Sequence, residues 1–571
     1  MKITVAKYCI HFLISKGIRI VPGIPGGTIL PIYDALAESE IQHILARQEQ
    51  GAGFIAQGMA RSTGQVSACL VSSGPGVANL LTSVSDAFSD SVPLLIFSGQ
   101  VPRNLLGTDA FQELPTKSIV SHFTKASYLI MDPLELPHIL EEAYLLAGSG
   151  RPGPVWIDLP KDVQNEFIDL ESQESLISPK ANDFTRIKAN LSELQTAIES
   201  TIRLLHSSKK SLFYIGGGAK KSAEALRRLV DSLQIPVVST LMGLGIFPKE
   251  NPNFLGMMGM HGSVSANSAL GECDLLIALG VRFDDRATGN IATFCPKAKV
   301  IHIDIDPKEI GKNKRADVFW KGDLSAFLEN LFEVSSKIKK GNFWQPSPEV
   351  ESASIREEGR IDRFFRSLSS HFRDSDFILT DVGQHQMWTA QYFPFPNERS
   401  WITSGGQGTM GFGLPTSIGV SLAHPDANVF CITGDGSIMM NLQELATLRE
   451  LNSNVKLIIF NNKHLGLVRQ QQELFYENRK SGSVFEFQPN FQMLAESFGI
   501  PGYKIMLGDR AEEQMKALLK PGPCLLEVMI PSEAGVYPFV PGGKSNQEFI
   551  LNPPLFDASK KDIENDLCIT S

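Results

Sequence analysis

The feature that most constrains this chain is the tripeptide Gly434-Asp435-Gly436, followed after 24 residues by Asn461-Asn462. The apolar run Val429–Thr433 before it predicts a buried strand, and Val455–Phe460 predicts a second one. Between them, leucines at threefold spacing predict a helix over Met440–Leu451. Two parallel strands need a crossover of this length, so the segment predicts one strand–helix–strand unit.

Such a unit places Asp435 and Asn462 just past the carboxyl ends of neighbouring strands, where open α/β sheets bind ligands. One carboxylate and one amide oxygen, with no soft ligand nearby, suit Mg²⁺ better than Zn²⁺. A Mg²⁺ ion held in this way keeps open positions, which usually go to phosphates of a substrate or cofactor. Gly434 and Gly436 let the backbone approach such a phosphate closely.

The composition is that of a globular protein with sizeable cores, since 43% of its 571 residues are hydrophobic. The net charge of −9, from 53 basic and 62 acidic residues, argues against a nucleic-acid partner. The seven cysteines lack any metal-binding spacing, and we expect reduced, mostly buried thiols. No apolar run reaches about 18 residues, so no membrane span is expected. The first residues resemble neither a signal peptide nor a transit peptide, which favours a cytoplasmic bacterial protein.

Strands and helices alternate in three blocks, which favours an α/β fold of three doubly wound parallel sheets. We expect domains over residues 1–165, 190–334 and 360–540, followed by a C-terminal tail over 541–571 that folds over a neighbouring surface or stays loose. Polar stretches at Asp169–Asp183 and Ser335–Ser354 are typical of linkers. Besides the two strands above, the predicted strands are Arg19–Pro22, Ala68–Val71, Leu94–Ser98, Ser211–Ile215, Val237–Ser239, Leu275–Leu279, Val300–Ile305, Phe377–Asp381 and Cys524–Met529.

Several further segments have the form of turns at strand ends. The segment 23–27 specifies a tight, open turn, for which a plain turn is the commoner explanation. The segment 72–79 joins a strand end, a Gly-rich turn and a helix start, so its amides could face a ligand. Glu49 stands at the start of the helix predicted over Ala52–Ala60, where a helix N-terminal charge is a sufficient reading by itself.

The middle block gives weaker signals. Gly216-Gly217-Gly218 follows a predicted strand, but Lys221 stands where a dinucleotide fingerprint has its third glycine. The segments 261–262, 280–282 and 304–306 also fall at strand ends or in the turns after them. These turns could line a nucleotide-sized groove, and purely structural roles explain the pattern equally well.

Nearly the whole chain resembles the thiamine-diphosphate enzymes, and most closely the acetohydroxyacid synthase (acetolactate synthase) large subunits. The last third is most similar to the bacterial isozyme I type, through HLGLVRQQQELFY at 464–476. The other segments that carry the resemblance are GIPGGTILPIYDAL at 23–36, RQEQGA at 47–52, SSGPGVANLLTSVSDAFSDSVPLLIFSGQVP at 72–102, GTDAFQE at 107–113, GRPGPVWIDLPKDV at 150–163, GQHQMW at 383–388, SGGQGTMGFGLP at 404–415 and NLQELATLRE at 441–450.

The resemblance implies that Glu49 hydrogen-bonds N1′ of the cofactor's aminopyrimidine ring and so helps to remove the C2 proton. Met410 corresponds to the bulky residue that bends the cofactor. Asp435 and Asn462 would hold Mg²⁺, with the backbone carbonyl of His464 as a third ligand. Other positions implied at the cofactor are Gly26, Gln384, His385, Gly408, Gly434, Gly436 and Ser437.

Two more groups of residues follow from the resemblance. The central domain would bind FAD, which takes no electrons in the net reaction, through Arg151, His261, Arg282, Asp304 and Asp323. The substrate pocket would contain Phe111, Gln112, Lys161 and Arg286, with Met260 near. Of these, Arg286, Lys161 and Gln112 could pair with a pyruvate carboxylate.

The implied reaction decarboxylates pyruvate and joins the hydroxyethyl unit to a second 2-keto acid, giving 2-acetolactate, the first step of branched-chain amino acid biosynthesis. In such enzymes the Glu49 block faces the metal block of another subunit. We therefore expect an active site between the subunits of a homodimer or tetramer, an inactive monomer, and a small regulatory subunit.

One departure concerns the choice of the second substrate. Many acetohydroxyacid synthases have Trp where this chain has Gln471, and that Trp favours 2-ketobutyrate. Losing a flat apolar wall removes discrimination of about 1–3 kcal/mol per methylene. We expect 2-acetolactate as the main product and only weak preference for 2-ketobutyrate, and sensitivity to herbicides that stack on the Trp is in doubt.

Four alternatives remain open at this point. Three are other thiamine-diphosphate enzymes: the FAD-independent catabolic acetolactate synthase, pyruvate oxidase and glyoxylate carboligase. The FAD-type stretches argue against the first, and Glu49 argues against the last, which has Val there. The fourth is a non-catalytic protein that senses the cofactor or nucleotides, against which the intact Glu49, Asp435 and Asn462 argue.

Overall fold

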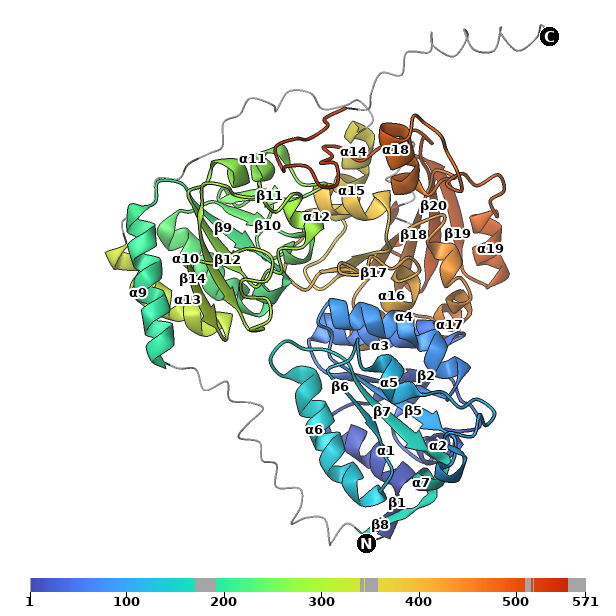
Figure 1. Ribbon diagram of the computed structural model, residues 1–571. Coiled ribbons are helices and arrows are strands. Elements are labelled where there is room, and N and C mark those ends of the chain that lie inside the picture. The colour runs from blue at the N-terminus through green and yellow to red at the C-terminus, as the bar shows by residue number, and fades with distance from the viewer. Residues whose placement is uncertain are drawn as a thin grey trace, which may run out of the picture.

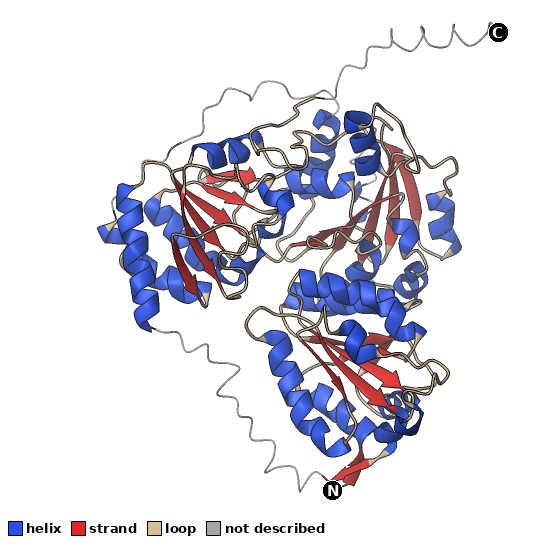
Figure 2. Cartoon of the chain, in the orientation of Figure 1, coloured by secondary structure: helices blue, strands red, loops and turns tan. Residues whose placement is uncertain are grey.

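The structure is a computed structural model that describes residues 2–169, 191–338, 344, 358–508, 515–516 and 518–552. The described residues form three α/β units, each built on a six-stranded parallel sheet flanked by helices (Figures 1 and 2). The predicted fold class is therefore confirmed. Most of the two predicted linkers, and the tail after residue 552, lie outside the described residues.

The N-terminal sheet has the strand order β3-β2-β4-β5-β7-β6. A small antiparallel pair, β1 with β8, closes the far end of this unit. The strands are β1 (Lys2–Thr4), β2 (Ile20–Gly23), β3 (Gln42–Leu45), β4 (Ser67–Val71), β5 (Leu94–Gln100), β6 (Ala126–Leu129), β7 (Val155–Pro160) and β8 (Phe167–Asp169). The helices are α1 (Val5–Ser15), α2 (Leu30–Ala37), α3 (Glu49–Thr63), α4 (Pro75–Ser89), α5 (Thr116–Val120), α6 (Leu136–Gly148) and α7 (Lys161–Asn165).

The C-terminal sheet repeats this topology, with the order β16-β15-β17-β18-β20-β19. Numbered within each unit, both sheets follow the order 2-1-3-4-6-5. The strands are β15 (Phe377–Thr380), β16 (Trp401–Thr403), β17 (Val429–Gly434), β18 (Val455–Asn461), β19 (Gly502–Met506) and β20 (Cys524–Met529). The helices are α14 (Glu358–Ser369), α15 (Gln384–Tyr392), α16 (Gly413–Ala423), α17 (Glu444–Leu451), α18 (Gly466–Phe475) and α19 (Phe491–Ser497).

The central sheet has a different order, β11-β10-β9-β12-β13-β14, which reads 3-2-1-4-5-6 within the unit. This is the strand order of dinucleotide-binding folds. The strands are β9 (Ser211–Ile215), β10 (Val237–Ser239), β11 (Phe254–Met257), β12 (Leu275–Leu279), β13 (Lys299–Asp304) and β14 (Val318–Lys321). The helices are α9 (Leu191–Ser207), α10 (Ala223–Leu233), α11 (Val264–Glu272), α12 (Asp285–Thr288) and α13 (Leu324–Glu333).

The N- and C-terminal units share one apolar core, which runs from residues such as Phe54 and Val71 to Ile418 and Val429. Helices α3 and α16 cross in this core, and Figure 1 shows them between the two sheets. The crossing depends on two glycines. A Cβ on Gly58 would lie 2.9 Å from the backbone nitrogen of Val420, and one on Gly419 would lie 2.8 Å from the carbonyl carbon of Ile55.

The predicted helix over Met440–Leu451 was wrong at its start. Residues Ile438–Met440 form a short 3₁₀ turn, and α17 begins only at Glu444. The side-chain amide of Asn441 donates a hydrogen bond to the carbonyl of Gly411, at 2.7 Å. This contact holds Asn441 at φ −136°, outside helical geometry, and so delays the helix.

The described residues also show the state of the cysteines, the helix lengths and the start of the tail. Six cysteines are free and buried, and Cys568 lies outside the described range. No described helix has the length and apolarity needed to cross a bilayer. The described start of the tail folds over the central unit: Asn546 donates to the side chain of Asn267 and to the carbonyl of Ala287, at 3.2 and 3.0 Å.

Candidate functional site

The carboxyl edges of the three sheets each contain a point where the strand order reverses. At such a point the turns after two adjacent strands diverge and leave a crevice for a ligand. In the N-terminal unit the crevice lies between the turns after β2 and β4, and in the C-terminal unit between those after β15 and β17. In the central unit it lies between the turns after β9 and β12.

Asp435 lies at the crevice of the C-terminal unit, directly after β17. Its side chain is buried, and the side-chain amide of Gln488 donates to Oδ2 at 2.8 Å. Burial raises the pKa of Asp435 to about 7, and the nearby carboxylate of Glu527 adds to the rise. A buried carboxylate beside a second one is a place where a cation would be bound favourably.

Asn462 follows the neighbouring strand β18 and is also buried. Its Oδ1 accepts the backbone N–H of His464 at 2.9 Å, and its Nδ2 donates to Oε1 of Gln384 at 3.0 Å. Gln384 in turn donates to Gln470 and to the carbonyl of Ala534. The amide of Asn462 therefore has a fixed orientation at the strand end.

His385 lies between two glycines at the same edge. A Cβ on Gly383 or on Gly434 would come within 2.7 or 2.9 Å of the imidazole ring, so both positions require glycine. Burial lowers the pKa of His385 to about 3, and its Nε2 has no hydrogen-bond partner in the described residues. Ser437 closes this edge by donating to the carbonyl of Val382 at 2.8 Å.

The segment 404–413 follows β16, the neighbour of β15 in the sheet, and contains Gly408 and Met410. Gly408 has φ +63°, a conformation that favours glycine. Beyond Met410, the carboxylate of Asp381 accepts the backbone N–H groups of Gly411 and Gly413, at 2.9 and 3.2 Å. Met410 itself is half-buried.

The crevice of the N-terminal unit contains Glu49, the first residue of α3. The side-chain amide of Asn79 on α4 donates to Glu49 Oε2 at 3.0 Å. Gly26 packs against Ser72, and Gly74 packs against Gln112, so that a Cβ at either glycine would collide with its neighbour. Phe111 is 87% exposed, which leaves a large apolar side chain beside this crevice in solvent.

The structure brings the predicted site residues into two groups within one chain. Glu49, Gly26 and Gln112 lie at the N-terminal crevice, and the residues around Asp435 lie at the C-terminal one. Among the described residues no hydrogen bond joins the two groups. Three predicted substrate residues lie on other elements: Lys161 starts α7, Arg286 lies on α12 and touches Met260 at 3.8 Å, and Gln471 is an exposed residue of α18.

Four of the residues predicted to contact FAD lie in the central unit, whereas Arg151 lies between α6 and β7 of the N-terminal unit. Arg151 pairs with Glu309 at 3.0 Å and with Asp306 at 3.4 Å, while Arg282 donates to the carbonyl of Ser89. The buried Nδ1 of His261 and the Oγ of Ser239 have no partner in the described residues.

Two aspartates of the central unit have different surroundings. Burial raises the pKa of Asp304 to about 6. Asp323 caps α13 by accepting the backbone N–H of Ser325, at 2.8 Å. Their roles toward FAD stay predictions.

Sequence reasoning missed three residues that shape these crevices. Gln488 holds Asp435, Asp381 holds the segment after Met410, and Glu444 accepts the backbone N–H of Arg47 at 2.9 Å, just before Glu49. Asp381 ended a predicted strand, which was a usable signal. The other two act across long sequence separations that no local pattern reveals.

Comparison with known proteins identifies the three units. Residues 3–119 match the family of the N-terminal TPP binding domain of thiamine pyrophosphate enzymes, 198–331 match the central domain, and 381–528 match the C-terminal TPP binding domain. The chain is 44% identical to the acetolactate synthase isozyme 1 large subunit of Escherichia coli K12, covering 96% of this chain and 98% of that one. It is 41% identical to the isozyme 2 large subunit of the same strain, with 95% and 99% covered, and 44% identical to the acetolactate synthase large subunit of Lactococcus lactis, with 95% and 96% covered. The chain therefore belongs to the thiamine pyrophosphate enzyme family, among its acetolactate synthase large subunits.

Proposed function

We propose that this chain is a catalytic large subunit that makes 2-acetolactate from pyruvate, with 2-ketobutyrate as a less favoured second substrate. The observation that carries the proposal is the pair of crevices on two sheets of the same topology. One presents a carboxylate, Glu49, and the other presents the oriented pair Asp435 and Asn462. The identity of 41–44% to acetolactate synthase large subunits over almost the whole chain supports this reading.

The residues at the C-terminal crevice fit a Mg²⁺ ion. Asp435 supplies a buried carboxylate, Asn462 supplies an amide oxygen, and the backbone of His464 follows directly. The described residues contain no cluster of three or more His, Cys, Asp or Glu side chains suited to a metal. A site with one carboxylate suits Mg²⁺, which completes its coordination with water and phosphate oxygens.

Thiamine diphosphate, when bound, supplies the carbanion chemistry by which pyruvate loses CO₂ and its remaining two-carbon unit joins a second 2-keto acid. The chain's own part is to bind, orient and move protons. Glu49 would hold a proton at N1′ of the pyrimidine ring, Met410 would support the bent conformation, and the unpaired Nε2 of the neutral His385 can accept a hydrogen bond. Gly434 and Gly436 leave room for the diphosphate.

Two copies of the chain would be needed for one active site. Glu49 is half-buried, and Phe111 beside the same crevice is largely exposed. Among the described residues, only the side chain of Asn79 forms a hydrogen bond to the carboxylate of Glu49. A partner's metal-bearing crevice placed against this edge would complete the site. We infer a homodimer or tetramer, in the cytoplasm, with a small regulatory subunit as a further partner.

The central unit would hold FAD in a structural role. Its strand order and the unpaired polar atoms of His261 and Ser239 support a nucleotide-sized ligand with polar groups. Arg286, Lys161 and Gln112 would supply the cationic and amide partners of the 2-keto acid carboxylates, with Phe111 and Gln471 shaping the pocket.

The test is to incubate the purified protein with pyruvate, Mg²⁺, thiamine diphosphate and FAD, and to follow CO₂, acetolactate and oxygen. We expect acetolactate with no oxygen consumed, and a yellow protein that carries FAD. Oxygen consumption together with a product at the oxidation state of acetate would instead indicate an oxidase. Absence of CO₂ release under all of these conditions would contradict the proposal.

A further inference from the structure

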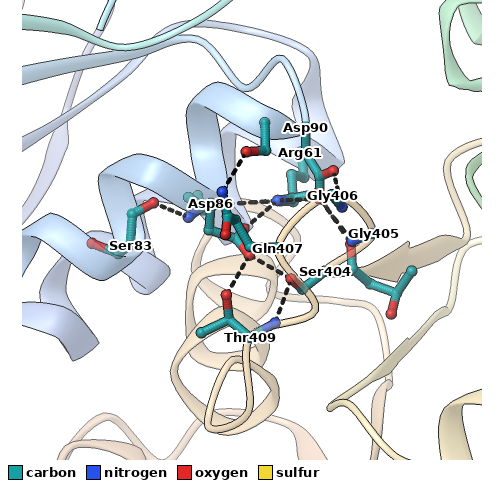
Figure 3. A network of polar contacts seen from close by, with 12 residues as sticks. Arg61, Ser83, Asp86, Asp90, Ser404, Gly405, Gly406, Gln407 and Thr409 are labelled. Carbon is teal, nitrogen blue, oxygen red and sulfur yellow. Dashed lines mark hydrogen bonds and ion pairs between the residues drawn. The ribbon is translucent and has the colours of Figure 1, made fainter. Parts of the chain in front are cut away.

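A buried polar cluster joins the N-terminal unit to the segment that leads to Met410 (Figure 3). It consists of Arg61 from the last turn of α3, Asp86 from the last turn of α4, and Asp90, which caps α4. Facing them is the segment 404–409, hereafter the 404–409 loop. The six residues of this loop belong to the C-terminal unit, and the last of them, Thr409, directly precedes Met410.

Every carboxylate oxygen in the cluster has a donor. Asp86 Oδ1 pairs with Arg61 at 2.8 Å, and Asp86 Oδ2 accepts the hydroxyl groups of Ser404 and Thr409, the latter at 2.9 Å. Asp90 Oδ2 pairs with Arg61 at 3.0 Å and accepts the backbone N–H of Gly405 at 2.9 Å. Asp90 Oδ1 accepts the backbone N–H of Gly406 at 2.7 Å.

The 404–409 loop depends on these contacts for its shape. It contains no helix or strand, and three of its residues are glycines. Within the loop, the backbone N–H of Thr409 donates to Ser404 Oγ at 2.9 Å, which closes it into a ring. Gln407 donates to Ser89 at 2.9 Å, and Arg61 donates to the carbonyl of Thr403 at 3.1 Å. The loop is thus attached to α3 and α4 by side chains at both of its ends.

Stability alone is a poor explanation for this arrangement. Asp86 and Asp90 are almost completely buried, and Arg61 is 8% exposed, so two carboxylates share one guanidinium away from water. Burial raises the pKa of Asp86, although Arg61 opposes the rise. Buried charge networks of this kind often add little net stability compared with apolar packing, and their best-attested role is to select one conformation.

The conformation that these contacts would select is that of the segment containing Gly408 and Met410. The 404–409 loop is fixed by Asp86 and Asp90 before Met410, and Asp381 fixes Gly411 and Gly413 after it. Met410 therefore lies between two anchored points, only one of which belongs to its own unit. The other end of α4 carries Asn79, which contacts Glu49.

We propose that Asp86 and Asp90 are positioning residues that hold the 404–409 loop, and through it Gly408 and Met410, in the conformation that binds thiamine diphosphate. This inference rests on the proposed function. Because Asn79, near the start of the same helix, donates to Glu49, α4 connects the two crevices of one chain. Neither aspartate is proposed to touch the cofactor.

The test compares four variants of the full-length protein: Asp90→Asn, Thr409→Val, Thr409→Ser and, as a control, Asp362→Asn. Thr409→Val is nearly isosteric but loses the hydroxyl that donates to Asp86, whereas Thr409→Ser keeps it. Asp362 pairs with Arg366 on the surface of α14, far from the cluster in sequence and structure (Figure 1). The readouts are hydrogen–deuterium exchange of the peptide that spans 404–410 in the apo protein, the Kd of thiamine diphosphate at saturating Mg²⁺, and the apo Tm.

We expect faster exchange in that peptide and a Kd raised about tenfold for Asp90→Asn and Thr409→Val, as loss of a charge-assisted hydrogen bond implies. Thr409→Ser and Asp362→Asn should match the wild type. The proposal would be overturned if Thr409→Val showed the exchange rate and Kd of the wild type. It would also be overturned if Thr409→Ser raised exchange and Kd as much as Thr409→Val does. Both outcomes can be observed even if Asp90→Asn fails to fold. If the wild-type protein binds the cofactor yet makes no acetolactate, the proposed function is refuted. The exchange rates and Kd values of the variants would still test the role of the two aspartates.

Discussion

The side-chain amide of Asn79 donates a hydrogen bond to Glu49 at 3.0 Å, so the N-terminal half of α4 orients the carboxylate that begins α3. The ideal Cβ position of Gly76, also on α4, lies 3.7 Å from the second carboxylate oxygen of Glu49. A methyl group at Gly76 would make ordinary van der Waals contact with that oxygen. The contact explains how a carboxylate at a helix start can be held in one orientation and still face outward.

Replacing Glu49 with Gln should leave thiamine diphosphate bound but slow removal of the C2 proton. The amide keeps the shape of the side chain and the Asn79 neighbour, but it cannot hold the proton at N1′. Positioned acid–base groups commonly contribute about 10²–10⁴-fold, and a loss in this range is expected. Hydrogen–deuterium exchange at C2 of the bound cofactor measures it.

The matched control is Glu38→Gln, which removes the exposed partner of Lys7 on the same unit. It should exchange C2 at the wild-type rate. If Glu49→Gln also exchanges at that rate, Glu49 has another role.

The sequence was sufficient to predict the edge that carries the candidate metal site. Strands β17 and β18 lie where their apolar runs predicted them, with Asp435 and Asn462 at their ends. Short strands such as β3, β16 and β19 were missed because three to five residues carry little pattern, although the equally short β10 was predicted. Strand β7 was missed although it is fully buried, because Asp158 interrupts its apolar run.

Long-range contacts explain what sequence reasoning did not reach. Asp86 and Thr409 are separated by 323 residues, and packing between their two units, chiefly of α3 against α16, brings them together. The strand order shared by the N- and C-terminal sheets is likewise set by packing of whole elements. No local propensity specifies either feature.

Introducing a methyl group at the crossing of α3 and α16 should destabilise the protein. In Gly58→Ala the new Cβ would meet the backbone of Thr416 and Val420, which cannot move aside as a side chain could. Overpacking of this kind costs about 1–3 kcal/mol or more. The apo Tm and the urea midpoint should both fall.

Gly359→Ala provides the comparison, since no atom of the described residues lies within 4 Å of its Cβ position and the residue is on helix α14. It should be neutral or slightly stabilising, as Ala is favoured over Gly in helices. Equal stability of the two variants would mean that the helix crossing is looser than the structure shows.

Asp158 should make stability depend on pH. It is buried on β7, where Ser98 and Gln100 donate to it at 2.6 and 3.0 Å, and burial raises its pKa from 3.8 to about 7. Between these values the folded protein binds the proton that the unfolded chain releases. The stabilisation that Asp158 contributes to the folded state is therefore fully present below about pH 4. As the pH rises to about 7, the free energy of unfolding falls by up to about 4 kcal/mol.

Thermal unfolding of the wild type and of Asp158→Asn over this pH range checks the sign. Asn does not titrate, so the difference in Tm between the two proteins should shift in favour of the variant as the pH rises. The absolute Tm of the variant does not report on the pKa of Asp158, because the new amide disturbs the hydrogen bond that Gln100 donates. Parallel curves would show that Asp158 has an ordinary pKa.

Gln471→Trp should shift the product ratio toward 2-aceto-2-hydroxybutyrate when pyruvate and 2-ketobutyrate compete. Gln471 is an exposed residue of α18, and an indole there adds an apolar wall for one extra methylene. The expected gain in discrimination is about 10-fold or more, in line with 1–3 kcal/mol per methylene. Gln472→Trp, one residue further along α18, is the control. A wild type that already forms mainly the hydroxybutyrate product would contradict the assignment.

We predict that one active site takes Glu49 from one chain and Asp435 from another. Mixing Glu49→Gln chains with Asp435→Asn chains, each inactive alone, tests it directly after unfolding and refolding together. In a mixed dimer one site would combine an intact Glu49 with an intact Asp435, and statistical mixing should restore about a quarter of wild-type acetolactate formation. If both residues served the same site within one chain, every site would keep a defect, and the mixture would stay as inactive as its parts.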